Sequence, residues 1–279
     1  MLVDNISYKG FTHKICEDYS LSAEGEKSFI IVADGCSSAP YSEIGSMLLS
    51  HAAAHTIRNS SDEILSDINL FKDVVLKRVL QSIKDWMDST YLYSTLLVCF
   101  PLKDDFIVYI FGDGVIATHS YKKEIQIHDI TYKNNYPFYL AYEEDKEIET
   151  SYRQGLHYGW GDNKNLAVWD GIKRNEKWEF IKNFNLSQQM PYGHSAYKFP
   201  IKDFKTITLF TDGISSFINS TGKKQSCIEL IPRFINYSKF KEEFVIKRAK
   251  NIIESLKKDT ISYDHYDDFS MATIFNTQD

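Results

Sequence analysis

The hydrophobic pattern of the chain changes period several times, and each change predicts a strand or a helix. Residues 28–35 read SFIIVADG, an uninterrupted apolar run that ends in an aspartate and a glycine. An apolar run this short, bounded by turn residues, is typical of a buried strand. The pattern returns in residues 206–213 as TITLFTDG. We therefore predict two central strands, at 28–33 and 205–211, each followed by a carboxylate.

Between and after the central strands, the apolar positions follow the helical period. Ser42 is expected to cap a helix beginning at Glu43, because serine oxygens accept hydrogen bonds from free N–H groups there. The apolar positions of this helix are Ile44, Met47, Leu48 and Ala52. Ser61 is expected to cap a second helix, whose core-facing stripe is Ile64, Ile68, Phe71, Val75, Val79, Ile83 and Trp86. Further helical segments are predicted at 214–218, 228–234 and 244–256.

Alternating or apolar stretches separated by tight turns predict antiparallel strands. These strands are expected at 1–9, 19–21, 94–100, 106–111, 115–120, 124–130 and 269–275, with one or two more within 166–203. We predict a single domain, residues 1–279, with an aromatic-rich insertion near 131–165. The insertion has two open interpretations, a functional lid or docking surface and a segment packed over the sheet edge.

Composition narrows the class of protein. The chain has 279 residues, 43% of them hydrophobic, and a net charge of −6, which argues against nucleic acid or an anionic membrane as the main partner. No apolar run reaches the roughly 20 residues that span a bilayer, and the amino-terminal stretch lacks a signal-peptide pattern. The four cysteines are too sparse for a disulfide scaffold, and none form a C-x-x-C pair. We expect a cytoplasmic protein with reduced thiols.

Acidic residues beside the predicted strand ends form the candidate chemistry. Asp34, Asp212 and Asp267 each adjoin a predicted strand, and a carboxylate there is costly unless it is paired or binds a cation. Mg²⁺ and Mn²⁺ prefer carboxylates, main-chain carbonyls such as that of Gly35, and water. Two such ions roughly 4 Å apart lower the pKa of a shared water and clamp a phosphoryl group. The sequence therefore predicts a divalent-metal site.

Several short motifs occur in one order along residues 10–276. They are Glu17-Asp18, Val32-Ala33-Asp34-Gly35, the helix start Ser42 to Ser46, Tyr93-Ser94-Thr95, Gly112-Asp113-Gly114, Thr211-Asp212-Gly213 and Asp267-Asp268-Phe269-Ser270. This ordered set resembles the metal-dependent protein serine/threonine phosphatases, called PPM or type 2C. The resemblance implies an α+β fold, a four-layer αββα sandwich in which two mostly antiparallel sheets are flanked by helix pairs.

The resemblance also implies roles for individual residues. Two Mn²⁺ or Mg²⁺ ions, with a weaker third, are the implied cofactors, and their implied ligands are Asp34 as the bridge, the Gly35 carbonyl, Asp212, Asp267 and, for the third ion, Asp113. The implied catalytic residues are Asp34, Asp18 and Glu17, the last two acting through metal-bound water. The implied nucleophile is a hydroxide that bridges the two metals.

The chain departs from the family pattern at the position that grips the substrate phosphate. The family often has an arginine four residues before the first glutamate, and this chain has His13 there, followed by Lys14. Both are candidates for phosphate binding, although neither has the bidentate fork of arginine. His13 is equally well explained as a histidine without ligand duty. Cys36 stands where many members carry a histidine or methionine, so no leaving-group acid is identified.

We expect a hydrolase that removes phosphate from phosphoserine and phosphothreonine in proteins, acting in signalling as a monomer. The alternative is a catalytically weak or inactive phosphatase-like module that binds a phosphoprotein. A phosphatase for small phosphorylated molecules is a third hypothesis.

Overall fold

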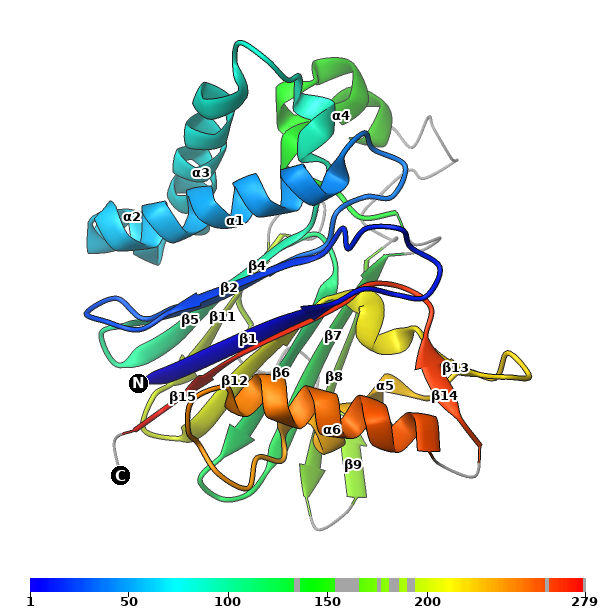
Figure 1. Ribbon diagram of the computed structural model, residues 1–279. Coiled ribbons are helices and arrows are strands. Elements are labelled where there is room, and N and C mark those ends of the chain that lie inside the picture. The colour runs from blue at the N-terminus through cyan, green and yellow to red at the C-terminus, as the bar shows by residue number, and fades with distance from the viewer. Residues whose placement is uncertain are drawn as a thin grey trace.

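Two antiparallel sheets lie face to face in the computed structural model, and helices cover their outer faces (Figure 1). The structure describes residues 1–132, 136–153, 166–174, 177–180, 186–189, 194–258 and 261–277. Within these residues, the seven-stranded sheet has the order β1 (Leu2–Tyr8), β15 (Phe269–Phe275), β12 (Phe204–Phe210), β6 (Gly114–Ser120), β7 (Ile125–Tyr132), β8 (Leu166–Arg174) and β9 (Lys177–Phe180). The six-stranded sheet has the order β10 (Leu186–Gln189), β11 (Ser195–Pro200), β5 (Asp105–Phe111), β4 (Leu96–Leu102), β3 (Phe29–Ala33) and β2 (Tyr19–Ala23).

The helices form two groups. The helices on the side of the six-stranded sheet are α1 (Ser42–Asn59), α2 (Asp62–Ser66), α3 (Ile68–Ile83) and the 3-10 turn η1 (Ser89–Leu92). The other sheet is covered by α5 (Cys227–Ile235) and α6 (Phe244–Lys258). The remaining elements are η3 (Leu140–Glu144), α4 (Lys146–Arg153), η6 (Asp212–Ser215) and a small hairpin of β13 (Phe217–Asn219) and β14 (Tyr263–His265). The predicted α+β sandwich is therefore confirmed.

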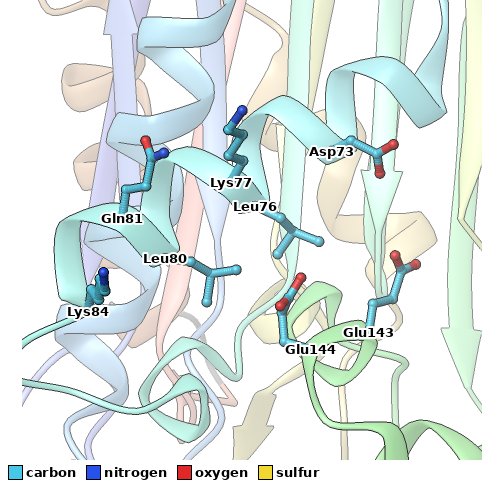
Figure 2. Close-up of a pocket in the computed structure, with 8 residues that line it drawn as sticks. All are labelled: Asp73, Leu76, Lys77, Leu80, Gln81, Lys84, Glu143 and Glu144. Carbon is cyan, nitrogen blue, oxygen red and sulfur yellow. The ribbon is translucent and has the colours of Figure 1, made fainter.

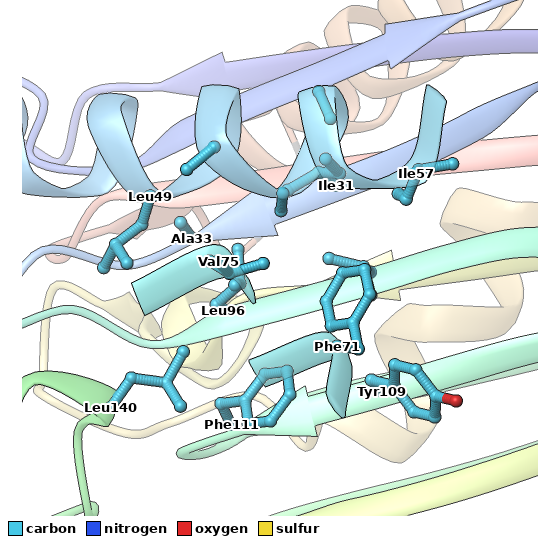
Figure 3. Close-up of a cluster of buried hydrophobic side chains, with 14 of the residues drawn as sticks. Ile31, Ala33, Leu49, Ile57, Phe71, Val75, Leu96, Tyr109, Phe111 and Leu140 are labelled. Atoms are coloured by element: carbon cyan, nitrogen blue, oxygen red, sulfur yellow. The ribbon is translucent and has the colours of Figure 1, made fainter. Parts of the chain in front are cut away.

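The apolar run of β3 is continuous because both faces of its sheet are buried. Ile31 and Ala33 point toward the core under α1 and α3, which Figure 3 shows. Ile30 and Val32 belong to the second core, between the two sheets. The strand therefore ends in a buried position, and it places the next residue, Asp34, where the two sheets end.

The helix predicted from residue 61 onward is two helices. Asp67 interrupts it with extended backbone (φ −119°, ψ 118°). Its side chain accepts hydrogen bonds from Asn69 N at 2.7 Å and Leu70 N at 3.3 Å, so it caps α3. Trp86, predicted to be buried, lies beyond the end of α3 and is 61% exposed. The apolar period persists across the break, which is why the pattern alone did not reveal it.

The buried face predicted for α1 is also wrong in part. Ile44, Met47 and Leu48 are only half-buried, and small residues such as Gly45 face inward. A Cβ at Gly45 would lie 1.9 Å from the Tyr91 carbonyl oxygen, so α1 packs directly on the main chain of η1. The hydrophobic pattern marks large apolar residues, but this contact depends on a small residue. The pattern therefore does not predict it.

The strands 106–111 and 115–120 were expected to form one meander, but they belong to different sheets. Gly112 (φ +97°) and Gly114 (φ +137°) adopt conformations that L side chains rarely take, and they carry the chain from β5 across to β6. Asp113 is thereby placed between the sheets. The short helix predicted at 214–218 is replaced by η6 and β13. More strands are present in the described residues than the roughly ten expected.

The insertion near 131–165 is described only in part, since residues 133–135 and 154–165 lie outside the described ranges. The single-domain assignment of residues 1–279 stays a prediction. No helix within the described ranges is long and apolar enough to cross a membrane.

Candidate active site

Four aspartates meet at one end of the sandwich. Asp34 follows β3, Asp212 follows β12, Asp113 lies between β5 and β6, and Asp18 precedes β2. Antiparallel strands alternate in direction, so the carboxyl ends of β3, β5 and β12 and the amino ends of β2 and β6 lie at the same edge. Asp18 and Asp113 are buried, at 5% and 4% exposure, and the other two are half-buried.

Hydrogen bonds fix the positions of two of these carboxylates. Asp18 Oδ2 accepts a hydrogen bond from Thr211 Oγ1 at 2.7 Å, which ties the two sheets together beside Asp212. The Asp18 carboxyl group lies close enough to Asp34 that its charge raises the pKa of Asp34. The main chain of Asp34 is fixed by Thr95, whose Oγ1 accepts from Asp34 N at 3.0 Å and whose N–H donates to the Asp34 carbonyl at 2.9 Å. The Gly35 carbonyl takes part in neither bond.

Burial and mutual repulsion disfavour the ionised form of these carboxylates. Burial, and then the charges of neighbouring aspartates, raise the pKa of Asp34 and Asp113 well above the usual range. Burial chiefly raises the pKa of Asp18 to about 8 and that of Asp212 to about 7. Among the described residues, none of the four forms an ion pair with lysine or arginine, and Asp18 Oδ1 is buried without a hydrogen-bond partner. Crowded carboxylate oxygens lacking a counter-charge fit a divalent cation.

The paired aspartates before β15 have different environments. Asp267 is 35% exposed at its side chain, and its Oδ1 accepts a hydrogen bond from Asp268 N at 2.9 Å. Its charge raises the pKa of both Asp212 and Asp113, which places it beside the four-aspartate cluster. Asp268 is buried at 2% exposure. Its oxygens accept from Gly10 N at 2.7 Å and Glu17 N at 2.5 Å.

His13, a predicted phosphate-binding residue, lies among carboxylates. Its Nδ1 is 2.9 Å from Asp268 Oδ2 and 3.6 Å from Glu17 Oε2, and its Nε2 is 3.4 Å from Asp267 Oδ1. Burial lowers the pKa of His13, but the hydrogen bond to Asp268 and the three negative charges raise it more, so the net shift is upward. Lys14 is exposed and forms no ion pair in the described part of the chain.

One atom each from His13, Glu17 and Asp268 lies within 4.8 Å of the other two, a spacing that a metal ion can bridge. The Asp268 oxygens already accept from two main-chain N–H groups and contact the imidazole. These contacts make the group an anchor of the loop between β1 and β2.

Two features of the site were not predicted from the sequence. Asp129 on β7 is a further carboxylate near the cluster, and its charge raises the pKa of Asp212 and Asp113. Burial raises the pKa of Asp129 itself to about 6, and the Cys227 thiol donates a hydrogen bond to it at 3.7 Å. It lies in a strand with no flanking glycine, so no sequence signal identified it. The anchoring role of Asp268 was hidden in the Asp-Asp pair.

The described part of the aromatic insertion covers the main chain that follows Asp34. Tyr139 is buried and lies close to Cys36. Its ring stacks on Tyr93 at a centroid distance of 6.0 Å, and Tyr142 meets Tyr93 edge-on at 4.9 Å. Burial, and then the nearby Cys36 and Asp34, raise the pKa of Tyr139 well above its usual range, so the phenol stays protonated.

A cavity of about 520 Å³ opens on the outer side of α3, where η3 approaches that helix (Figure 2). Its walls are Asp73, Leu76, Lys77, Leu80, Gln81, Lys84, Glu143 and Glu144. None of these residues belongs to the four-aspartate cluster, and Glu143 is paired with Lys72. We do not assign the chemistry to this cavity.

Comparison with known proteins places this geometry in a family. The family model described as protein phosphatase 2C matches residues 12–252. No curated protein matches the chain in sequence.

Solved structures share the fold at low identity. The serine/threonine phosphatase Stp1 from Staphylococcus aureus is 11% identical, with a TM-score of 0.55 over 98% of this chain and 94% of that one. The serine/threonine phosphatase of S. agalactiae is 15% identical, with a TM-score of 0.51 over 98% of each chain. A C. elegans sex determining protein is 15% identical, with a TM-score of 0.53 over 98% of this chain and 64% of that one.

Proposed function

Because the chain belongs to the protein phosphatase 2C family of protein serine/threonine phosphatases, we propose that it hydrolyses phosphoserine and phosphothreonine in proteins with divalent metal ions held by its buried aspartates. The observation that carries the proposal is the convergence of Asp18, Asp34, Asp113 and Asp212 at one sheet edge without a compensating lysine or arginine in the described residues. Such a cluster is unfavourable on its own and favourable around a cation.

We propose the metal ligands that the family resemblance implies, and the mutual effects of these carboxylates on their pKa values support their proximity. Asp34, with its main chain fixed by Thr95, is suited to a central, shared position, and the Gly35 carbonyl is the adjacent main-chain ligand. Asp212 and Asp267 are the other ligands of the principal pair of Mn²⁺ or Mg²⁺ ions, and Asp113 serves a weaker third ion. Bound at these residues, the ions would supply positive charge for the phosphoryl group and a deprotonated water as the nucleophile.

The remaining residues of the site position these ligands. Asp18 accepts from Thr211 Oγ1 and therefore has one oxygen fixed and one, Oδ1, directed at the cluster without a partner. Glu17 is likewise held by its main chain, because its N–H donates to Asp268 and its carbonyl accepts from Ser46 Oγ at 2.6 Å. We propose that Glu17 and Asp18 orient water molecules around the ions.

We further propose that the partner is a phosphorylated protein, which the enzyme meets as a monomer in the cytoplasm. The net charge of −6 and the four free cysteines support that environment and argue against nucleic acid as a partner.

One observation favours a second candidate, a phosphatase-like module with weak or no catalysis. The His13 ring is surrounded by three carboxylates, so the position expected to grip the phosphate is occupied within the protein. Such a module would bind a phosphoprotein and release no phosphate.

Phosphate release from a phosphothreonine peptide, titrated with Mn²⁺ and reversed by EDTA, distinguishes the two candidates. Asp34→Ala and Asp212→Ala are each expected to lower turnover by at least about a hundredfold, since each removes a metal ligand. Asp73→Ala, which removes an exposed carboxylate on α3, is the matched control and should retain full activity. Phosphate release that does not respond to Mn²⁺, or full activity in Asp34→Ala, would contradict the proposal.

A further inference from the structure

The active site needs a positive side chain for the substrate phosphate, and two nearby cationic residues, His13 and Lys9, are engaged within the protein. A phosphate monoester carries close to two negative charges at neutral pH. His13 contacts Asp267, Asp268 and Glu17. The Lys9 ammonium donates to the main-chain carbonyls of Gly10 at 3.2 Å and His13 at 2.6 Å. These cations hold the loop between β1 and β2.

Lys224 approaches the site from a different part of the chain, the turn after β13. Its main chain pairs with Ile218 in an isolated antiparallel bridge. Within the turn, Asn219 Oδ1 accepts hydrogen bonds from Thr221 N at 3.0 Å and Lys223 N at 2.8 Å. The turn therefore has a defined conformation, and the position from which the Lys224 side chain starts is fixed.

The Lys224 ammonium lies at the rim of the metal site. Its Nζ is 5.4 Å from the ring centroid of Tyr266, within the range of a cation–π contact. Tyr266 directly precedes Asp267, and its N–H donates to the Ser216 carbonyl at 3.3 Å.

The Lys224 ammonium lies over the ring of Tyr266, the residue before Asp267, and is not engaged by a carboxylate in the described residues. The residue is exposed, and in the described residues its Nζ forms no ion pair within 4.0 Å. A lysine ammonium is a mobile point charge on a flexible stem, so it can leave the Tyr266 ring for a phosphate oxygen. A residue that only neutralised the cluster would be expected in direct contact with a carboxylate.

We propose that Lys224 binds the phosphate group of the substrate and that Tyr266 holds its ammonium ready at the edge of the metal site. The proposal rests on the proposed phosphatase function, because it assigns the phosphate to the cluster of Asp34 and Asp212. It makes Lys224 a substrate-binding residue that no sequence motif indicated.

The test compares Lys224→Gln with Lys223→Gln, the neighbouring exposed lysine of the same turn, and with Lys224→Arg. Steady-state kinetics on a phosphothreonine peptide give KM and kcat, and inorganic phosphate is used as a competitive inhibitor. Lys224→Gln should raise KM and the inhibition constant of phosphate by about five- to tenfold, the effect of one exposed charge-assisted hydrogen bond. Lys223→Gln should match the unchanged protein, and Lys224→Arg should restore most of the loss.

Two further readouts separate this proposal from others. Calorimetric titration should give the same Mn²⁺ affinity for Lys224→Gln as for the unchanged protein. If the substitution changes the Mn²⁺ affinity but leaves inhibition by phosphate unaltered, the phosphate-binding role is overturned. If the unchanged protein releases no phosphate in Mn²⁺, the proposed function fails, and binding of a fluorescent phosphothreonine peptide then decides on Lys224. Equal peptide affinity in Lys224→Gln and Lys223→Gln would overturn the inference.

Discussion

The substitution Asp268→Ala tests whether the anchor of the β1–β2 loop stabilises the protein. Asp268 is buried and accepts hydrogen bonds from the main-chain N–H groups of Gly10 and Glu17. It also lies 2.9 Å from His13 Nδ1. Alanine would leave both N–H groups without these acceptors and would remove the closest counter-charge of the imidazole.

The magnitude follows from these contacts. A buried donor that loses its acceptor costs about 1–3 kcal/mol, so the two N–H groups together cost about 2–6 kcal/mol. Relief of repulsion between Asp268 and the nearby Glu17 and Asp267 offsets part of this cost. We expect a decrease of about 3 kcal/mol in the free energy of unfolding. Asp267→Ala is the matched control, because that carboxylate is 35% exposed, and its removal should cost less than about 1 kcal/mol.

Urea denaturation of the metal-free protein in EDTA, followed by circular dichroism, measures both variants without interference from metal binding. At an unchanged slope of about 3 kcal/mol/M, Asp268→Ala should lower the urea midpoint by roughly 1 M. Asp268→Asn, which retains one acceptor oxygen, should fall between Asp268→Ala and the unchanged protein and remains measurable if the alanine variant does not fold. Equal midpoints for Asp268→Ala and Asp267→Ala would refute the reasoning.

Two other predictions concern the carboxylate cluster and the helix layer. Because burial raises the pKa of Asp18 to about 8 and of Asp212 to about 7, the metal-free folded protein retains protons that the unfolded chain has released above pH ~4. Its melting temperature in EDTA should therefore fall as the pH rises from 5 to 8, and saturating Mn²⁺ should reduce this slope; a rise in stability over that range would contradict the electrostatic picture. Gly45→Ala should lower the free energy of unfolding by about 3 kcal/mol or more, because its Cβ would lie 1.9 Å from the Tyr91 carbonyl oxygen. His51→Ala, at an exposed position of the same helix, is the control in the same denaturation assay.

The sequence predicted the strand ends of the site well, for a physical reason. A carboxylate followed by glycine at the end of a continuous apolar run, as at Asp34 and Asp212, indicates where a buried strand ends, and the prediction of a site rested on several such motifs occurring in order. The local pattern contains both the strand and its end, so no long-range information is needed. The layered arrangement came from the family resemblance, and the confirmed family membership supports that part.

Contacts between segments that are distant in the sequence could not be predicted from it. His13 and Asp268 are 255 residues apart, and nothing near His13 indicates that its partners are carboxylates at the other end of the chain. The pattern of an Asp-Asp pair does not say which carboxylate is buried as an anchor and which is partly exposed. Lys224 belongs to a short basic pair in a polar turn, a composition typical of any solvated loop.

The packing errors had a different origin. Hydrophobic periodicity predicts which residues avoid water, but α1 is placed by Gly45 and Ser46, which permit close approach rather than bury apolar area. Asp67 also satisfies the helical pattern on either side of it, and only its extended backbone shows that it caps α3. A sequence pattern with the correct period therefore predicts the presence of helices better than their ends or their inner faces.

The switch between sheets at Gly112 and Gly114 explains why the cluster can form at all. Had β5 and β6 been joined by a hairpin within one sheet, Asp113 would lie at the tip of a turn, where water screens its charge. Because the chain crosses from one sheet to the other, Asp113 is buried between them and faces Asp212. The resulting repulsion is the cost of concentrating carboxylate oxygens where a divalent ion can neutralise them. The same two glycines therefore determine both the separation of the sheets and the charge of the site.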